Sequence, residues 1–544
     1  MCTEARVRCS AAMIMLCLSV APRTIHAQVP TRLDLGGRTQ VGGEAERYLR
    51  AVSLSGSRPA SPWTLQPFSA HVERGVMPSA PHPWSGRFTP AESLPHIRLL
   101  RPAVTLIGNS AFPFQESVGP IWAGRGATVA AQGGVAASWG RLDVQVAPIA
   151  FVAQNLEFPL APNGQRGTAR FADARYPLFI DYPQRFGSTS YGRLDPGHSM
   201  ITLSLPRVSL GLSSEPQRWG AAHDLPLVLG PASGGFPHAF LGTNAPVNFG
   251  LFRLQARLIG GTLQQTSYSA AVVGQEHRTV SGLVLAASPR GMSGLEVGFE
   301  RFFESTRPAS LQQLLRPFSL RAFVGALGDT IAGNIQNENQ IASAFFRWAL
   351  PAGGVELYGE WYREDFPGGL RKFILKPDDL STFDLGFQRV LVATPLHRRL
   401  VRFEIVNGEV SQQERGQRGG GYPLPPYVHF DGVPQGHTQH GLLLGSPEAY
   451  GGAGWRLAVD NYTPSGRTTL GLERFLRFDA IAGPGSDTAD IHPDVFYGVR
   501  AELLRFSGAQ DYTISVVPAL DLNRNLERGN DVFNLHVALT VHGW

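Results

Sequence analysis

The feature that most constrains this chain is a two-residue alternation of apolar and polar side chains, which recurs from about residue 102 to the C-terminus. Residues 252–258 read FRLQARL, with apolar side chains at even positions and Arg or Gln at odd positions. A period of two places one set on each face of a β-strand. The same alternation occurs at 295–300, 401–406 and 470–473. The pattern predicts a mostly-β chain whose strands have one apolar and one polar face.

Two architectures fit such strands. In a large soluble antiparallel protein the apolar face is the core, whereas in an outer-membrane barrel it meets lipid and the polar face lines the lumen. The polar face here carries ionisable groups in mid-strand, as a wet lumen permits: Arg253, Arg257, Glu300, Arg402, Glu404 and Glu473. The chain also ends on an aromatic residue, Trp544, which is typical of barrels inserted by the outer-membrane assembly machinery. We therefore predict an all-β transmembrane antiparallel β-barrel over residues 101–544, with about 16–18 strands.

The N-terminus is typical of an exported protein. Arg6 and Arg8 precede an apolar run at 11–21, so residues 1–27 are predicted to be a signal peptide. All three cysteines, Cys2, Cys9 and Cys17, lie inside it. The mature chain therefore has no disulfides, no thiolate metal site and no cysteine nucleophile.

Residues 28–100 differ from the rest of the chain. Residues 44–55 carry apolar side chains at helical spacing, with Gly56 as the expected stop, and a run rich in Pro, Trp and His follows. We predict a small helical and loop segment on the periplasmic side of the barrel.

The composition argues against two other classes of protein, helical membrane proteins and nucleic-acid-binding proteins. No apolar run after the signal is long enough for a transmembrane helix. The net charge of +5 is mild and its arginines are scattered, so nucleic-acid binding is not expected.

One stretch breaks the strand pattern. Between Asp224 and Arg253 there is no formal charge, and prolines and glycines are mixed with aromatics without a period. We interpret it as irregular backbone folded over or into the lumen, linking strands at 199–212 and 248–259. Within the first of these strands, the alternation changes phase after Pro206, which predicts a β-bulge.

No catalytic signature stands out. The chain lacks a Gly-x-Ser-x-Gly elbow, a phosphate loop and a His-Glu-x-x-His motif. His437 and His440 have a metal-like spacing, but glycines flank them and no carboxylate cluster completes a site. Paired acidic residues such as 364–365 and 378–379 are expected to be solvated charge. We predict no catalytic residue, no metal and no cofactor, and hence a protein that is not an enzyme.

Glycan binding is better supported, because sugars are held by aromatic faces together with planar polar side chains. Aromatic and polar side chains of this kind are close together in three parts of the chain. The candidate polysaccharide-binding residues are Arg218, Trp219, His238, Trp361, Arg363, Tyr422 and Tyr427. The alternative is that such aromatics belong to the girdles at the membrane interfaces.

Several motifs together resemble the capsule-assembly Wzi family of outer-membrane proteins. They are IDYPQRFG (180–187), YGRLDPGHS (191–199), SSEPQRWG (213–220), GGFPHAFLGT (234–243), LYGEWYRED (357–365) and GHTQHGLLLG (436–445). The resemblance covers most of the chain from about Ala45, and residues 180–250 are its most specific part.

The resemblance implies an 18-stranded barrel with a small periplasmic helical bundle. It also implies a lectin-like, non-enzymatic role in attaching capsular polysaccharide or another exopolysaccharide to the cell surface. The expected partners are that polysaccharide, outer-membrane lipid and the polysaccharide export machinery. The alternative function is an outer-membrane porin or uptake channel, and an enzyme at the barrel rim is a third hypothesis.

Overall fold

The computed structural model describes residues 39–54, 63–77, 81–88, 96–114, 119–271, 276–292, 294–319, 337–364, 374–375, 377–378, 380–410, 425–429, 433–478, 492–508 and 510–543. The predicted signal peptide, Gly56, Tyr422 and Trp544 lie outside these residues.

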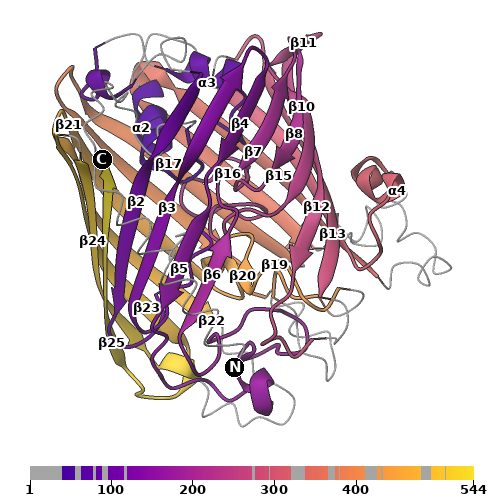
Figure 1. Cartoon of the computed structure of the whole chain (residues 1–544), viewed down its shortest axis with the longest axis vertical. Helices are drawn as coiled ribbons and strands as arrows, with labels where there is room; N and C mark the ends of the chain where they lie inside the picture. The colour runs from indigo at the N-terminus through magenta and orange to yellow at the C-terminus, as the bar shows by residue number, and fades with distance from the viewer. Residues whose placement is uncertain are drawn as a thin grey trace.

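The chain folds into a closed antiparallel β-barrel, which has 18 strands in the described residues. This count lies within the predicted 16–18 and is even, as is usual for bacterial barrels. The barrel strands, drawn in Figure 1, are β2 (Ile97–Asn109), β3 (Gly126–Trp139), β4 (Leu142–Val146), β5 (Ile149–Ala153), β6 (Tyr191–Asp195), β7 (Met200–Ser204), β8 (Val208–Ser213), β10 (His238–Thr243), β11 (Val247–Phe249), β12 (Phe252–Gln264), β13 (His277–Pro289), β14 (Leu295–Ser305), β15 (Glu338–Leu350), β16 (Val355–Glu364), β17 (Ser381–Ala393), β18 (Arg398–Asn407), β21 (Ala453–Thr463), β22 (Gly466–Phe478), β23 (Asp494–Ser507), β24 (Gln510–Leu522) and β25 (Val532–Gly543).

Three of these strands are interrupted by proline. The pairs β4 and β5, β6 and β7, and β10 and β11 each continue along one neighbouring strand, with Pro148, Pro196 and Pro246 in the gaps. Proline has no backbone N–H to donate to the sheet, so the ladder breaks there. The sheet closes where β2 pairs with β25.

Two sequence expectations about the wall are wrong. Pro206 does not mark a bulge: it lies in the turn between β7 and β8, which pair as a hairpin with Ser204 opposite Ser209. The link after β8 is also shorter than expected, because β10 returns to the wall at His238, opposite Ser213. The non-strand segment is therefore residues 214–237, which we call the plug.

The predicted alternation is confirmed: the apolar set of side chains lies on the outer surface of the barrel, and the charged set lies on its inner surface. Leu285, Leu357 and Leu470 are exposed on the outer surface, at 41%, 42% and 62%. Glu404 and Glu473 on the inner surface are each only 2% exposed. An apolar outer band around a polar lumen is the arrangement of outer-membrane barrels.

The two ends of the barrel differ. Short turns such as 140–141, 351–354 and 464–465 lie at one end, and long connections such as 154–190 and 408–452 lie at the other. Outer-membrane barrels have short periplasmic turns and longer extracellular loops. By this rule we assign the end with short turns to the periplasmic side.

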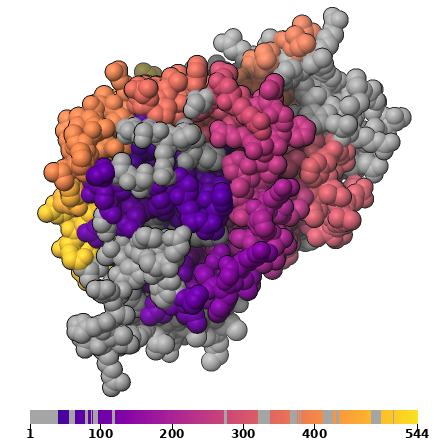
Figure 2. All heavy atoms as spheres, turned by 90° about the horizontal axis from the view of Figure 1, so that it is seen from above, coloured from indigo at the N-terminus to yellow at the C-terminus, as the bar shows by residue number. Residues whose placement is uncertain are grey.

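The N-terminal segment fills this periplasmic end, where its atoms, indigo in Figure 2, lie within the ring of strands. Helix α2 (Glu44–Ser53) matches the helix predicted at 44–55, and α3 (Ala70–Val76) follows it. Tyr48 of α2 packs on Trp84 and on Tyr462 of the wall. The helical segment is thus held inside the barrel mouth by aromatic contacts.

The remaining elements are short. Among the described residues, none of the helices is long and apolar enough to cross a membrane. The short elements outside the barrel wall are β1 (Leu65–Gln66), β9 (Arg218–Trp219), β19 (Thr438–Gln439), β20 (Leu442–Leu443), α4 (Leu311–Leu314), and the 3₁₀ turns η1 (Ser85–Arg87), η3 (Gly167–Phe171), η4 (Arg316–Phe318), η7 (Pro351–Gly353), η8 (Pro447–Ala449) and η10 (Arg524–Leu526).

Candidate functional site

The plug lies inside the lumen, and almost all of its residues are buried. Leu225, Leu227 and Val228 have no exposed surface and pack in one cluster with inward side chains of the wall. Irregular backbone is tolerated at membrane depth only where protein or a cavity surrounds it. The uncharged part of the plug, residues 225–237, is thus explained: it belongs to the core of a filled barrel.

The wall satisfies the polar backbone of the plug. The carboxylate of Glu404 on β18 accepts hydrogen bonds from the backbone N–H groups of His223, Asp224 and Leu225, at 3.2, 3.1 and 2.6 Å. It also accepts one from the hydroxyl of Tyr358, at 2.7 Å. One wall carboxylate therefore organises a turn of the plug.

A second lumenal segment, residues 433–446, supports the plug from the extracellular side. Gly230 donates its N–H to the carbonyl of Leu444 at 2.9 Å, and Ser446 donates to the carbonyl of Pro226 at 2.7 Å. The ring of His437, one of the predicted metal-like pair, lies between the carbonyl of Val228 and the carboxylate of Glu304 on β14, at 2.7 and 2.6 Å. His437 therefore joins plug to wall.

Charges also fix the plug to the wall. Arg402 on β18 ion-pairs with Asp224 of the plug, and its guanidinium donates to Nδ1 of His223 at 3.0 Å. Burial, helped by Arg402, lowers the pKa of His223 to about 4, so this ring is neutral and accepts that hydrogen bond. In the described residues no group of three or more His, Cys, Asp or Glu side chains could hold a metal ion.

Two of the predicted binding residues are in the plug and are buried. Arg218 and Trp219 form β9, which pairs with β1 of the N-terminal segment. Arg218 ion-pairs with Glu46 of α2, and the fully buried ring of Trp219 lies edge-on to Phe302 on the wall, with ring centres 6.3 Å apart. Both side chains connect the plug to its surroundings.

The structure places His238 and Tyr427 near the same plug. His238, at the start of β10, has its Nδ1 2.7 Å from the carbonyl oxygen of Phe236. The hydroxyl of Tyr427 donates to the carbonyl of Leu227 at 2.8 Å, and its ring is fully buried.

Trp361 and Arg363 lie apart from the other candidates. Both are in phase with Leu357 on β16 and alternate with Tyr362, whose ring contacts Tyr427 inside the barrel; Trp361 is partly exposed, whereas Arg363 is only 3% exposed. The structure therefore brings Arg218, Trp219, His238 and Tyr427 together around the plug, and leaves these two on the opposite face. Glycan contact by any of the seven candidates stays a prediction.

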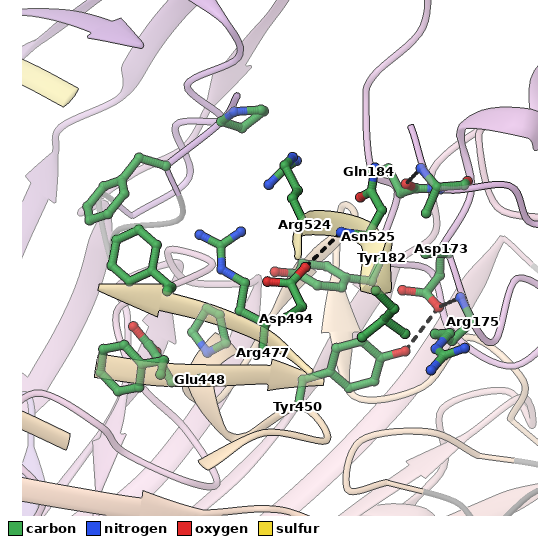
Figure 3. A pocket seen from close by; sticks show the side chains of 18 of the residues that line it. Asp173, Arg175, Tyr182, Gln184, Glu448, Tyr450, Arg477, Asp494, Arg524 and Asn525 are labelled. Atoms are coloured by element: carbon green, nitrogen blue, oxygen red, sulfur yellow. Dashed lines mark hydrogen bonds between the residues drawn. The ribbon is translucent and has the colours of Figure 1, made fainter. Parts of the chain in front are cut away.

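A different set of side chains faces open space at the extracellular end. They line a cavity of about 380 Å³, which we call the mouth cavity (Figure 3). Its volume is within the range of about 300–1,000 Å³ that small-molecule sites occupy. Long connections between strands meet the ends of β22 and β23 there. The lining includes Phe114, Asp173, Arg175, Tyr182, Gln184, Glu448, Tyr450, Arg456, Glu473, Phe475, Arg477, Asp494, Phe496, Arg524 and Asn525.

Aromatic rings form part of the mouth cavity. The rings of Tyr182 and Tyr450 meet edge to face, with centres 5.6 Å apart. The guanidinium of Arg477 lies over the ring of Phe496 at 4.8 Å, and that of Arg524 lies over Phe112 at 4.0 Å. These contacts hold the rings and guanidinium planes in fixed orientations.

The polar groups of the mouth cavity are held just as firmly. The hydroxyl of Tyr450 donates to Asp173 at 3.0 Å, and Asp173 also accepts backbone N–H groups from Arg175 and Tyr176, at 2.9 and 2.7 Å. Burial raises the pKa of the Asp173 carboxyl, and the three hydrogen bonds oppose that effect. The N–H of Asn525 donates to Asp494 at 3.0 Å.

The mouth cavity was not predicted from the sequence. Its lining comes from segments that are far apart in the chain, and no single segment carries a recognisable pattern. The only signal was the motif at 180–187, which contains Tyr182 and Gln184. Because this motif lies in a long loop and combines an aromatic ring with an amide, it could have indicated a binding site at the end of the barrel.

The same motif contains a carboxyl group from which a pH effect follows. Asp181 accepts hydrogen bonds from the N–H and hydroxyl of Thr266, at 2.7 and 2.6 Å, yet burial raises its pKa to about 6. Below about pH 4 the carboxyl is neutral in both the folded and unfolded chain, and above pH 6 it is charged in both. The free energy of unfolding therefore decreases as the pH rises from 4 to 6, by about 3 kcal/mol at most.

We expect Asp181→Asn to remove this pH dependence. The difference in melting temperature between variant and wild type should move in favour of the variant from pH 4 to pH 7. Thermal unfolding in detergent at several pH values measures it, with Asp143→Asn at the turn end of β4 as the control. A constant difference across this range would contradict the assignment.

Comparison with known proteins supports the fold. The structure is similar to that of Wzi, an outer-membrane protein involved in group 1 capsule assembly in Escherichia coli and described as a carbohydrate-binding β-barrel. The TM-score is 0.59 at 14% identity, and the match covers 93% of this chain and 99% of that one.

Two other barrels are more distant. Pseudomonas aeruginosa OccK1 matches with a TM-score of 0.35 and 11% identity, over 81% of this chain and 97% of that one. Acinetobacter baumannii OccAB4 matches with a TM-score of 0.38 and 9% identity, over 84% and 99%. No protein-family model and no curated protein sequence matches. The fold is that of a bacterial outer-membrane barrel.

Proposed function

We propose that this protein is a non-enzymatic glycan-binding barrel of the outer membrane, which holds capsular polysaccharide or a related exopolysaccharide at the cell surface. The observation that carries the proposal is the mouth cavity at the extracellular end of a filled lumen. The similarity to Wzi, which binds carbohydrate, supports it. The expected partners remain the polysaccharide, outer-membrane lipid and the export machinery.

The chemistry of the mouth cavity suits sugars. A sugar ring presents an apolar C–H face and several hydroxyl groups, so it needs an aromatic surface beside planar hydrogen-bonding groups. Tyr450, Arg477 and Asp494 supply these types of group within one cavity. The lining holds four arginines and four carboxylates, so its formal charge is balanced. Recognition of hydroxyl groups is favoured over capture of a highly charged polymer.

The filled lumen disfavours the alternative of an open diffusion porin. A barrel of 16–18 strands normally leaves an aqueous channel, but here the plug and the N-terminal segment occupy it. A polymer that reached the mouth cavity would be retained at the surface.

We expect Tyr450→Ala to weaken binding of the organism's surface polysaccharide by about 30-fold, because it removes a central aromatic group worth about 2 kcal/mol at a binding hot spot. Tyr450→Phe keeps the ring and loses only its hydrogen bond to Asp173, so it should bind within about fivefold of wild type. Calorimetric titration of purified protein with the polysaccharide measures both.

The matched control is Phe533→Ala, which removes an aromatic ring that is 58% exposed on β25 and lies outside the mouth cavity. In cells, deletion of the gene should reduce cell-associated glycan, and only the control should restore it fully. Wild-type binding by Tyr450→Ala, or unchanged cell-associated glycan after deletion, would refute the proposal.

A further inference from the structure

The lumen is filled unevenly. On the side of β14–β16, large inward side chains such as Phe302, Tyr358 and Tyr362 contact the plug and the segments around it. Midway along β24, β25 and β2, the inward side chains are small and often carry hydroxyl groups. A second cavity, of about 230 Å³, lies along this side, and we call it the inner cavity. Its lining there is Thr105, Ile107, Thr513, Ser515, Ala538 and Thr540.

The inner cavity continues the mouth cavity toward the periplasm. The two cavities share Arg456 and Glu473 as lining residues. At its other end the inner cavity is lined by the start of the N-terminal segment, Gly42 to Arg47. Space beside the plug thus extends from the extracellular mouth to α2, divided at one place.

The division is an ion pair. Nε of Arg456 on β21 donates to Glu473 on β22 at 2.9 Å, and Arg500 donates to the same carboxylate at 3.3 Å. Arg456 also pairs with Glu448 at 3.3 Å, and 15% of its side chain is exposed. Because Arg456 also contacts Glu448 and Glu473 also contacts Arg500, each side chain keeps a partner of opposite charge if the pair between them separates.

The periplasmic end is closed by a similar arrangement. Arg467 on β22 holds Glu44 with bonds of 3.0 and 2.6 Å, and Arg47 pairs with Glu502 on β23 at 3.1 Å. Both acidic and basic groups of the first turn of α2 are thus tied to the wall beside the inner cavity.

We propose that this protein has a second function: the wall formed by β2 and β21–β25 carries a narrow polar passage for small hydrated ions and solutes. The pair Arg456–Glu473 closes it in the middle, and the first turn of α2 closes it at the periplasmic side. Five arginines and five carboxylates line the inner cavity, so the passage discriminates weakly between cations and anions. The inner cavity is too small for a polysaccharide, so the proposed glycan would stay in the mouth cavity and only small solutes would enter the passage.

Cysteine accessibility tests the middle closure. The native cysteines at 2, 9 and 17 all lie within the predicted signal peptide, so Ser515→Cys places a single thiol in the inner cavity. A small membrane-impermeant methanethiosulfonate is added to intact cells. In the background Arg456→Gln/Glu473→Gln, labelling should be at least about fivefold faster than in the otherwise native chain, a change that corresponds to about 1 kcal/mol.

Two further variants sharpen this test. Arg101→Gln breaks a buried ion pair with Asp511 that lines neither cavity, and it should leave the labelling rate unchanged. Ala538→Trp fills the inner cavity and should return the rate in the double variant to the native value. If the double variant does not assemble, Glu473→Gln alone replaces it, with the same expected direction. Equal labelling with and without the ion pair overturns the proposal.

Conductance tests the whole route. Adding Glu44→Gln/Arg47→Gln to the double variant should give an ion current in planar bilayers that Ala538→Trp abolishes. A folded quadruple variant without current would show that the inner cavity does not reach the periplasm, and this too overturns the passage. Neither outcome depends on glycan binding, so the two proposals fail separately.

Discussion

A chain that lacks both the plug (214–237) and the N-terminal segment (39–88) is expected to form a wide open pore in planar bilayers, whereas the full chain, whose lumen is filled, is not. The reason is that the wall of a barrel with 18 strands encloses a space wide enough for an aqueous channel. The two deleted segments contribute much of the buried clusters that fill this space, and residues between 427 and 450 contribute another part. The resulting increase in conductance should exceed that caused by any single substitution in the lumen.

The wall itself is expected to survive the deletion. Ser213 of β8 and His238 of β10 lie opposite each other, so an Asn-Gly turn between them restores a hairpin. β10 also pairs with β12, from His238 opposite Gly261 to Gly242 opposite Arg257. Assembly is checked by resistance of the barrel to protease before conductance is measured.

Single deletions provide the control. Removing only the plug leaves α2 tied to the wall, and removing only the N-terminal segment leaves the plug on Glu404, so each should conduct less than the double deletion. A folded double deletion that stays closed would show that other loops block the lumen.

The second large effect is expected from Arg50→Ala, which should release α2 from the barrel. The Arg50 guanidinium is fully buried, ion-pairs with Glu356 on β16 and donates to the carbonyl of Ala221 in the plug at 2.7 Å. Truncating one partner of a buried ion pair leaves the other charge without full compensation, at a cost of about 3–5 kcal/mol. Amide hydrogen exchange in residues 44–53 should accelerate accordingly.

Arg47 of the same helix is the matched control. It also ion-pairs with a glutamate of the wall, Glu502, but 22% of its side chain is exposed. Such a pair contributes about 0–1 kcal/mol, so Arg47→Ala should change exchange in the helix by less than about tenfold. Equal effects of the two substitutions would mean that burial of Arg50 does not decide the docking of α2.

Much of the fold could be predicted from local pattern. Alternation with Arg and Glu on one face predicted a barrel and its inside, because a period of two forces the two sets onto opposite faces. Gly140, with φ of +62°, lies in the two-residue hairpin turn that joins β3 to β4. Helical spacing at 44–55 predicted α2. These predictions hold because each depends on neighbours in sequence.

The errors have a common cause. Pro206 was interpreted as a bulge although it forms a turn, and β10 was included in the link although it pairs with β8 and β12. In both cases the deciding factor is which strand lies alongside, and alternation within one strand does not contain that information.

The sequence by itself determined the barrel, the charged groups on its inner face and the presence of an irregular segment between two parts of the wall. Only the tertiary structure decided what that segment does and where the open site lies. Glu404 accepts hydrogen bonds from three backbone amides of the plug. Tyr450 donates a hydrogen bond to Asp173 at the mouth cavity, although 277 positions separate these two residues in the chain. The physical reason is the closure of the sheet into a barrel. Closure brings loops that are distant in the chain to one end of the barrel, and it places the inward-facing carboxylates against the backbone that fills the lumen.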